Sequence, residues 1–341
     1  MKNELANDDA ERILEERIEK IQQIVLGYGE ENFYISFSGG KDSCVVSALL
    51  DEAVPDNQIP RVFFNTGIEY NAIVKFVKDL AANDSRFEIV RPAEDKRKGF
   101  LTDEDIRNGY RPVNIPKMLE EVGYPFKSKE YSKILENWRR GNRTSNWMRN
   151  YLGGFEGREW SKFTCPVSLR YQFTDEYTEN GLKISSKCCD MLKKKPAKAY
   201  NKARGKTWVI TGMMREEGGH RTSIHSCVSL KSSDGTNHFS PLIPVSAEWE
   251  DWYIERCGIR LCELYYPPYN FKRTGCKGCP YSLELQANLD TLAKYLPSER
   301  AQCERIWKPV YDEYRRIGYR LTNQVTMSEY MMQKGKDHDL S

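Results

Sequence analysis

Six consecutive residues, Ser38 to Ser43, carry the first pattern in this sequence that could do chemistry. They read SGGKDS and stand between an apolar run and a stretch with helical spacing. Two glycines let the backbone approach an anion closely, and the amides that open a helix point at such an anion. The pattern is not a Walker A loop, because the four-residue spacer and the Gly-Lys-Ser/Thr ending are missing. An ordinary strand–helix turn is the alternative.

Four of the ten cysteines form a second pattern. Cys188 and Cys189 are adjacent, and after 86 intervening residues Cys276 and Cys279 form a CxxC clamp, which can present two thiolates to one metal. Four thiolates suit zinc or an iron–sulfur cluster. Neighbouring residues of an extended chain point to opposite sides, which favours a cluster over a single tetrahedral ion. Zinc, and structural or free cysteines, remain the alternatives. The lysines flanking the pair, which would stabilise thiolates, are Lys187, Lys193, Lys194 and Lys195.

Alternating strands and helices must position these residues. This alternation predicts an α/β fold with a doubly wound, mostly parallel sheet. Ligands bind such sheets at the carboxyl ends of the strands, where the SGGKDS loop would lie. Gly27 is the expected cap at the end of the first helix. Strands are expected at residues 33–38, 61–67, 87–92 and 208–213, and helices at 8–26, 41–53, 70–82 and 129–138 and through most of the chain from residue 247.

Composition limits the classes of protein that remain. The net charge is only +3, which does not imply a nucleic-acid partner, and no apolar stretch is long enough to span a membrane. The N-terminus is acidic and lacks an apolar signal core, so a cytoplasmic protein is expected. Disulfides are disfavoured in that reducing compartment, and clustered cysteines there point to metal or redox chemistry.

The motifs resemble one known group of enzymes. SGGKDS, followed by a strand that ends in Asn65-Thr66-Gly67, resembles the pyrophosphate-loop (PP-loop) superfamily of adenine-nucleotide enzymes, with its adenine nucleotide alpha-hydrolase-like fold. Within it, the sequence is most similar to phosphoadenosine phosphosulfate (PAPS) and adenosine phosphosulfate (APS) reductases. Residues 210–217 with Arg221 resemble the second nucleotide motif of these reductases, and residues 240–252 resemble their PL…W…D segment. The four cysteines resemble the cluster ligands of the iron–sulfur branch.

The resemblance implies a role for each matching residue. Lys41 and Arg215 would stabilise negative charge on the phosphates. Asp42 would position Mg²⁺ if ATP is the substrate, or it would cap the helix. These three are the expected catalytic residues. The expected nucleotide contacts are Ser38, Gly39, Gly40, Lys41, Asp42, Ser43, Thr66, Gly67, Gly212, Arg215 and Arg221, and the expected 4Fe-4S ligands are Cys188, Cys189, Cys276 and Cys279.

The resemblance also suggests how the chain divides. The matching motifs span about residues 33–285 and leave the later helices and a long intervening stretch uncovered. We therefore expect an N-terminal helix at 1–27, a nucleotide-binding α/β domain at 28–92 and 186–285, an insertion or cap at 93–185, and C-terminal helices with a tail at 286–341.

Two departures from the reductases affect the expected reaction. Leu192-Lys193 stands where the reductases carry Arg-Lys, and no cysteine follows Cys303 to serve as their tail nucleophile. An internal cysteine or a thiol reductant protein would have to supply that thiol. The alternative is an enzyme that splits ATP between its α and β phosphates, yielding AMP and pyrophosphate, and transfers sulfur to the adenylated acceptor. A sulfur-transfer partner is compatible with this alternative. A nucleotide or redox sensor without turnover is a third reading.

The segment 138–149 bears on the choice of partner. Trp138, Trp147 and four arginines alternate there, and arginines can contact phosphates while aromatics stack on bases. This pattern would suit a subunit of a nucleic-acid sulfur-modification system; an amphipathic cap with buried tryptophans is the alternative. The sequence is also compatible with a homo-oligomer. Among the remaining cysteines, Cys44 is expected in the core, Cys165 is an alternative ligand, and Cys303 has no expected role.

Overall fold

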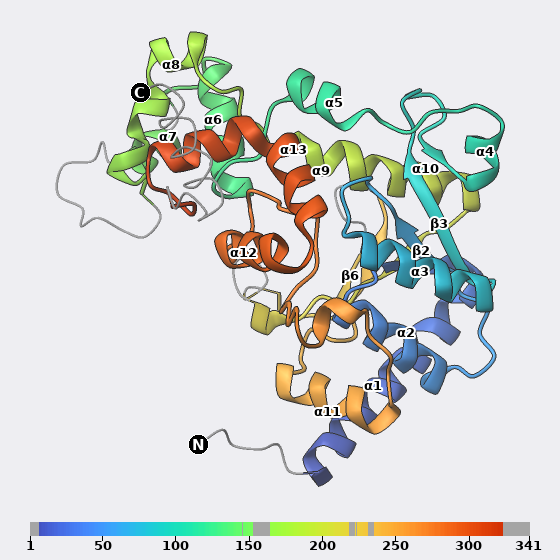
Figure 1. Ribbon diagram of the computed structural model, residues 1–341. Coiled ribbons are helices and arrows are strands. Elements are labelled where there is room, and N and C mark those ends of the chain that lie inside the picture. The colour runs from blue at the N-terminus through green and yellow to red at the C-terminus, as the bar shows by residue number, and fades with distance from the viewer. Residues whose placement is uncertain are drawn as a thin grey trace. The chain divides into compact units, whose positions relative to one another are not determined.

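The chain forms two compact units in the computed structural model (Figure 1), which describes residues 7–144, 146–152, 164–217, 222, 224–230 and 235–322. The first unit comprises Met1–Ile115 and Cys189–Lys277, and the second comprises Pro116–Cys188 and Gly278–Ser341. The expected insertion is therefore divided at Ile115, and its later part joins the C-terminal helices. In the described residues, no helix combines the length and the apolar character needed to cross a membrane.

A seven-stranded sheet is the centre of the first unit, in the order β4-β3-β2-β1-β5-β7-β6. The central pairs are parallel, while β4 and β6 at the two edges run antiparallel to their neighbours. The predicted α/β class with a mostly parallel sheet is confirmed. The strands are β1 (Phe33–Phe37), β2 (Arg61–Phe64), β3 (Phe87–Pro92), β4 (Phe100–Leu101), β5 (Trp208–Ile210), β6 (Val228–Ser229) and β7 (Asn237–Phe239).

Helices follow the strands and cover the sheet. The strands are apolar on both faces, as expected for a sheet buried on both sides. Tyr34, Phe64 and Val209 face α10 and pack there with Tyr200. The helices of the first unit are α1 (Asn7–Tyr28), α2 (Lys41–Ala53), α3 (Asn71–Asn83), α4 (Asp103–Arg107), α10 (Lys195–Arg204) and α11 (Ala247–Cys257).

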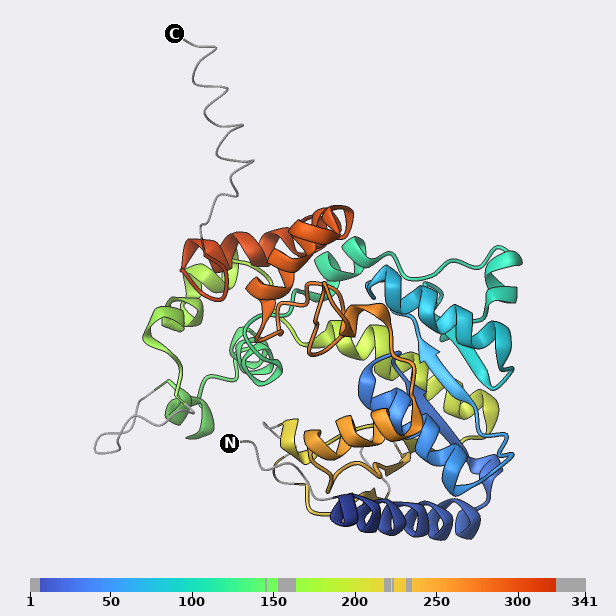
Figure 2. The same cartoon turned by 60° about the horizontal axis from the view of Figure 1, so that its bottom comes forward.

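The N-terminal helix packs beside α11 (Figure 2), which links the two ends of the first unit. Trp249 Nε1 donates to the carbonyl of Ala10 at 3.0 Å. The predicted end of α1 at Gly27 is wrong, since the helix runs through Gly27 to Tyr28. The glycine with left-handed backbone is Gly29, at φ 83°, so the chain turns there instead.

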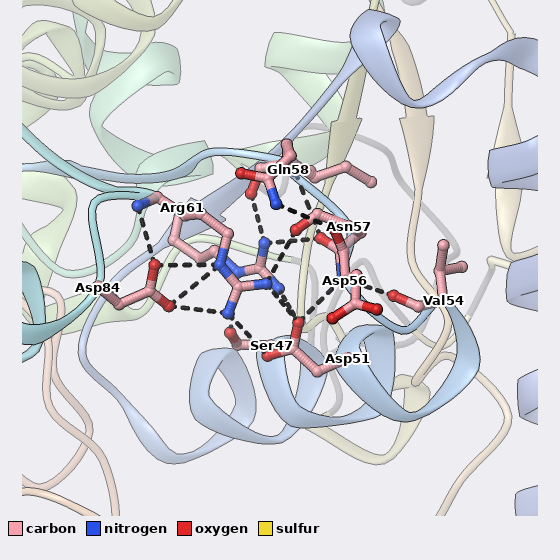
Figure 3. Close-up of polar contacts among 10 residues, drawn as sticks. Ser47, Asp51, Val54, Asp56, Asn57, Gln58, Arg61 and Asp84 are labelled. Carbon is pink, nitrogen blue, oxygen red and sulfur yellow. Dashed lines mark hydrogen bonds and ion pairs between the residues drawn. The ribbon is translucent and has the colours of Figure 1, made fainter.

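A buried arginine fixes the start of β2 (Figure 3). Arg61 is fully buried and donates to Asp51 Oδ1 at 2.7 Å, Asn57 Oδ1 at 2.8 Å and Ser47 Oγ at 3.1 Å. Asp51 also accepts from Arg86 at 2.7 Å, so one carboxylate neutralises two guanidinium groups. A buried charge is tolerated only when it is paired and hydrogen-bonded, and this network meets both conditions.

The second unit is built around α13 and the segment before α6. The Tyr314 hydroxyl accepts from the amide of Lys127 at 2.7 Å, and its ring lies 4.7 Å from that of Phe126. The predicted helices at 129–138 and in the C-terminal region are confirmed. The helices of this unit are α5 (Ile115–Val122), α6 (Lys129–Arg139), α7 (Asn146–Tyr151), α8 (Asp175–Asn180), α9 (Lys187–Cys189), α12 (Leu285–Tyr295) and α13 (Pro297–Arg316), of which α5 and α9 cross the division between the units.

Candidate functional site

The SGGKDS loop joins β1 to α2 and is closed by its own hydroxyl groups. Ser43 Oγ donates to the carbonyl of Gly40 at 2.8 Å and accepts from the amide of Ser38 at 3.2 Å. Ser38 Oγ accepts from the amide of Gly40 at 3.2 Å and lies 3.1 Å from Ser43 Oγ. Gly39 has φ 71°, and a Cβ there would lie 2.9 Å from Ile73. The loop therefore needs glycine at this position for both its backbone conformation and its packing.

Lys41 is held against α11. Its Nζ lies 2.7 Å from Glu250 Oε2 and 3.0 Å from Asp251 Oδ1. Burial lowers the pKa of Lys41, but the two carboxylates more than offset this and raise it overall. The lysine is thus charged, and that charge is partly neutralised by its own chain.

Asp42, which is half-buried, and Glu250, which is buried, form an acidic pair next to the loop. Burial, followed by the charge of Asp42, raises the pKa of Glu250 to about 7. Glu250 Oε1 is buried and has no hydrogen-bond partner among the described residues. A divalent cation prefers such carboxylate oxygens, so these two side chains fit Mg²⁺. Gly212 packs directly behind them, because a Cβ on it would lie 2.7 Å from the carbonyl oxygen of Asp42.

A cavity of about 240 Å³ opens at the loop and runs beneath α10. Its wall combines apolar sheet residues such as Tyr34 and Val209 with polar groups. Asn201 also lines the cavity; its Nδ2 donates to Thr236 Oγ1 at 3.1 Å, while its Oδ1 is buried and unpartnered among the described residues. The charged and hydroxyl-bearing residues of the wall are Ser36, Ser38, Glu69, Lys193, Lys194, Lys198, Thr211, Thr236 and Thr274.

Thr66 and Gly67 lie at the carboxyl end of β2, as expected, but Thr66 is already engaged. Its amide donates to Glu69 Oε2 at 2.9 Å, and its hydroxyl lies 2.8 Å from both carboxylate oxygens of Glu69. Gly67 turns the chain at φ 86°. Burial raises the pKa of Glu69, which lies in the wall of the cavity beside Lys193.

The adjacent cysteines lie on a helix. Cys188 and Cys189 belong to α9, which runs directly into a π-helical stretch at Asp190–Lys194. The expectation of an extended pair is wrong, since neighbouring helical side chains diverge by about 100° rather than 180°. Cys188 is buried and Cys189 is half-buried. π-Helical turns are rare in proteins, but those that occur are often found at functional sites. Here the turn includes Lys193, which lines the cavity.

Within the first unit, Cys189 and Cys276 interact electrostatically. Burial raises the pKa of the Cys276 thiol, Lys193 lowers it, and Glu69 and Cys189 raise it. Thr66 Oγ1 lies 4.0 Å from Cys276 Sγ. Cys188 and Cys279 belong to the second unit. Among the residues that the structure describes, no three His, Cys, Asp or Glu side chains gather into a metal-binding group.

The second nucleotide segment is only partly engaged with the loop. Gly212 lies against α2, whereas Arg215 is exposed and donates from Nε to the carbonyl of Ile224 at 3.1 Å. Arg221 lies outside the described residues. Among the described residues of this segment, Gly212 therefore lies against the start of α2, and Thr211 lines the cavity that opens at the loop.

The Trp/Arg segment serves the packing of the second unit. Trp138 packs edge-to-face on Phe173 with ring centroids 5.6 Å apart, and the Arg143 guanidinium lies 4.7 Å from the Trp138 ring. Arg139 donates to the carbonyl of Leu182 at 2.6 Å. The side chain of Trp147 lies outside the described part. These contacts match the alternative of a structural cap.

The remaining cysteines are buried or apart from the loop. Cys44 and Cys165 are buried, and burial raises the pKa of both thiols. Cys303 is fully buried in the second unit, where a Cβ on Gly278 of the CxxC clamp would lie 2.7 Å from its Sγ. No role was predicted for Cys303 from the sequence. In the structure it packs so closely against Gly278 that a larger residue would not fit there.

Four residues of the site were not predicted from the sequence. Glu69, Glu250, Tyr265 and Thr274 reach the loop or the cavity through the fold. Two of them had a sequence signal, because Glu69 is three residues beyond Thr66 and Glu250 lies within the segment 240–252.

Comparison with known proteins finds a similar domain for part of this chain. Residues 32–142 match the phosphoadenosine phosphosulfate reductase domain. The match covers less than half of the chain. The chain is also similar to glutamine-hydrolysing GMP synthases, at 28% identity over 190 residues to that of Nitratiruptor sp. and 27% over 192 residues to that of Lactobacillus gasseri. Each match covers 52% of this chain and only 35% of the synthase.

Two solved structures share low overall similarity with the chain. One is a PAPS reductase from Candida auris in a phosphate complex, with a TM-score of 0.42 and 13% identity over 80% of this chain and 96% of the other. The second is the U34-tRNA thiolase NcsA from Methanococcus maripaludis with its [4Fe-4S] cluster, with a TM-score of 0.36 and 14% identity over 92% and 83%.

Proposed function

We propose that this chain is an enzyme that binds an adenine nucleotide, with its phosphates at the SGGKDS loop, and uses it in sulfur chemistry. The cavity carries this proposal. It opens at Ser38, is lined by three lysines that suit phosphate or sulfate, and has apolar sheet residues further along that suit a base. The match to the PAPS reductase domain supports the same ligand class.

We further propose that Cys188, Cys189, Cys276 and Cys279 ligate a 4Fe-4S cluster. The donor set fits, since four thiolates suit such a cluster. Burial raises the pKa of the Cys276 thiol, and Lys193 partly offsets this by lowering it. Cys189 and Cys276 interact within one unit; Cys188 directly precedes Cys189, and Cys279 follows Cys276 after a two-residue spacer. When bound, the cluster would supply a redox couple.

Sulfonucleotide reduction is the first reaction to test. A thiolate would attack the sulfur of the sulfonucleotide, the nucleoside phosphate would leave with the electrons of the broken S–O bond, and a second thiol would then release sulfite. Lys193 and the loop amides would hold the negative charge that develops on the leaving phosphate. The attacking thiol would come from an internal cysteine or from a thiol reductant protein.

Cleavage of ATP between the α and β phosphates is the second candidate, favoured by the acidic pair. Asp42 and Glu250 fit Mg²⁺, which ATP brings to its site and a sulfonucleotide does not require. An oxygen of the acceptor would attack the α-phosphorus, and pyrophosphate would leave. Hydrosulfide delivered by a sulfur-transfer partner would then attack the activated carbon of the acceptor, and AMP would leave with the acceptor's oxygen. The similarity to synthases supports this candidate.

Product analysis separates the two. The chain, purified without oxygen, is offered ATP, APS and PAPS separately with a dithiol. Sulfite from a sulfonucleotide establishes reduction, whereas AMP and pyrophosphate from ATP without sulfite establish the second candidate. Neither product from any nucleotide, with no measurable binding, would refute the proposed function.

The cluster has its own test with a matched control. Wild-type protein should contain about four irons and acid-labile sulfides per chain. Cys189→Ser and Cys276→Ser should lose them, while Cys257→Ser, at an exposed cysteine of α11, should retain them. Zinc in place of iron, or iron retained in both ligand variants, would overturn this assignment.

A further inference from the structure

The amide that opens α2 is already hydrogen-bonded to a residue far along the chain. The amide of Lys41 donates to the hydroxyl of Tyr265 at 3.1 Å. The residue before it, Gly40, offers no side chain to cap the helix. In a phosphate-binding loop this amide is one of the groups that point at the anion. Tyr265 therefore stands where a ligand oxygen would be expected.

Tyr265 passes this interaction on to a second hydroxyl. Its Oη lies 2.6 Å from Oγ1 of Thr274, and Thr274 lines the cavity whereas Tyr265 does not. Burial raises the pKa of Tyr265 to about 12, so its hydroxyl remains protonated. The two hydroxyls hold two protons, and the contact between them uses one. If Tyr265 donates to Thr274, the proton of Thr274 is free to point into the cavity.

Gly40 lies at the point where these hydroxyls meet the loop. A Cβ on Gly40 would lie 3.1 Å from Ser38 Oγ, 3.2 Å from Tyr265 Oη and 3.4 Å from Thr274 Oγ1. Three hydroxyl oxygens from three parts of the chain therefore surround one glycine. Thr274 has no other hydrogen-bond partner among the described residues.

We propose that Tyr265 and Thr274 form a hydroxyl relay that extends the N-terminus of α2 into the cavity, where Thr274 donates to a phosphate oxygen of the bound nucleotide. This inference rests on the proposed function and adds the residues that hold the phosphates. A chain of hydrogen bonds that starts at a helix N-terminus polarises in one direction, which strengthens its last donor toward an anion. The same oxygen could belong to inorganic pyrophosphate, the product or a fragment of the nucleotide.

The alternative is that Tyr265 only caps α2. A cap contributes to stability whether or not a ligand is present, whereas the relay contributes to the affinity for phosphate. Adenosine, which has no phosphate, provides the reference ligand.

The test uses Thr274→Val, which keeps the shape and removes the hydroxyl, and Thr274→Ser, which restores it. Calorimetry measures ATP, inorganic pyrophosphate and adenosine on the full chain, with the unliganded Tm in parallel. Thr274→Val should lower the affinity for ATP and pyrophosphate about 10- to 100-fold, because it removes one hydrogen bond to a charged group. The affinity for adenosine and the Tm should not change. Thr274→Ser should bind within about threefold of wild type.

Tyr265→Phe tests the first link. It should weaken ATP less than Thr274→Val does, and should add nothing when both substitutions are combined, because the relay ends at Thr274. The relay would be overturned if Thr274→Val bound ATP and pyrophosphate as tightly as wild type does. It would also be overturned if the affinity for adenosine fell by the same factor as the affinity for ATP. If wild-type protein binds pyrophosphate but no adenine nucleotide, the proposed function fails, and the relay is judged on pyrophosphate.

Discussion

Gly212→Ala should disturb the SGGKDS loop, because Gly212 packs against the start of α2. The added Cβ would lie 2.7 Å from the carbonyl oxygen of Asp42 and 2.8 Å from its carbonyl carbon, whereas ordinary contact begins near 3.4 Å. The two nearest atoms are backbone atoms of Asp42, and an alanine methyl has no torsion that would move its Cβ away from them. Overpacking of this kind costs about 1–3 kcal/mol. We expect either a Tm lower by several degrees or, where the first turn of α2 shifts to relieve the clash, nucleotide affinity lower by about tenfold or more.

The matched control is Gly27→Ala. Gly27 lies exposed inside α1, with no atom within 4 Å of an added Cβ. Alanine there should leave nucleotide affinity unchanged and raise stability by up to about 1 kcal/mol, because glycine is a poor helix former. Thermal unfolding and calorimetry with ATP measure both variants. If Gly212→Ala matches wild type in Tm and in affinity, the close packing of β5 against α2 does not position the loop.

Three further predictions test other parts of the structure. Arg61→Met should lower the free energy of unfolding by about 3 kcal/mol, since it leaves the buried hydrogen-bond partners of Arg61 without a donor. Arg97→Ala should change it by less than about 0.5 kcal/mol, because Arg97 is exposed. Equal effects of the two substitutions in denaturant titrations would contradict this prediction. Glu250 has its folded pKa raised to about 7 from an ordinary value of 4.5, so the folded state binds this proton more tightly and stability should rise as pH falls through 7 toward 4.5. Glu250→Gln should remove that rise, and a Tm profile that keeps it would assign it to another group. Trp138→Ala should lower the Tm through lost packing on Phe173 and leave oligonucleotide binding unchanged; a lost oligonucleotide complex at unchanged Tm would make Trp138 a ligand contact.

Two strands were predictable within a residue from local sequence, because polar turns bound the segments that form β1 and β3. The predicted strands at 61–67 and 208–213 were too long, since β2 ends at Phe64 and β5 at Ile210. The end of α1 was less predictable. Gly27 and Gly29 both follow the last apolar turn, and only the backbone angle shows that the chain turns at Gly29.

The candidate site was predictable only where it is local in sequence. SGGKDS lies within one turn, so its role follows from the strand before it and the helix after it. The adjacent cysteines were visible as a pair, but their helical conformation depends on the π-helical stretch that follows. Lys41 was expected at the phosphates because of its position in the motif. Its pairing with Glu250 and Asp251 depends on how α11 packs, about two hundred residues later, which no local pattern encodes.

One segment connects the two chemistries of the site. Residues 265–277 contact the start of α2 through Tyr265, line the cavity through Thr274, and contact the end of β2 through the amide of Lys277, which donates to the carbonyl of Ile68 at 2.6 Å. Cys276 lies one residue before that bond and two residues after Thr274. If a phosphate oxygen binds Thr274 as proposed, the backbone on which it acts also carries the Cys276 thiol two residues later. We therefore expect a substitution at Thr274 to change the reactivity of the Cys276 thiol as well as the affinity for nucleotide.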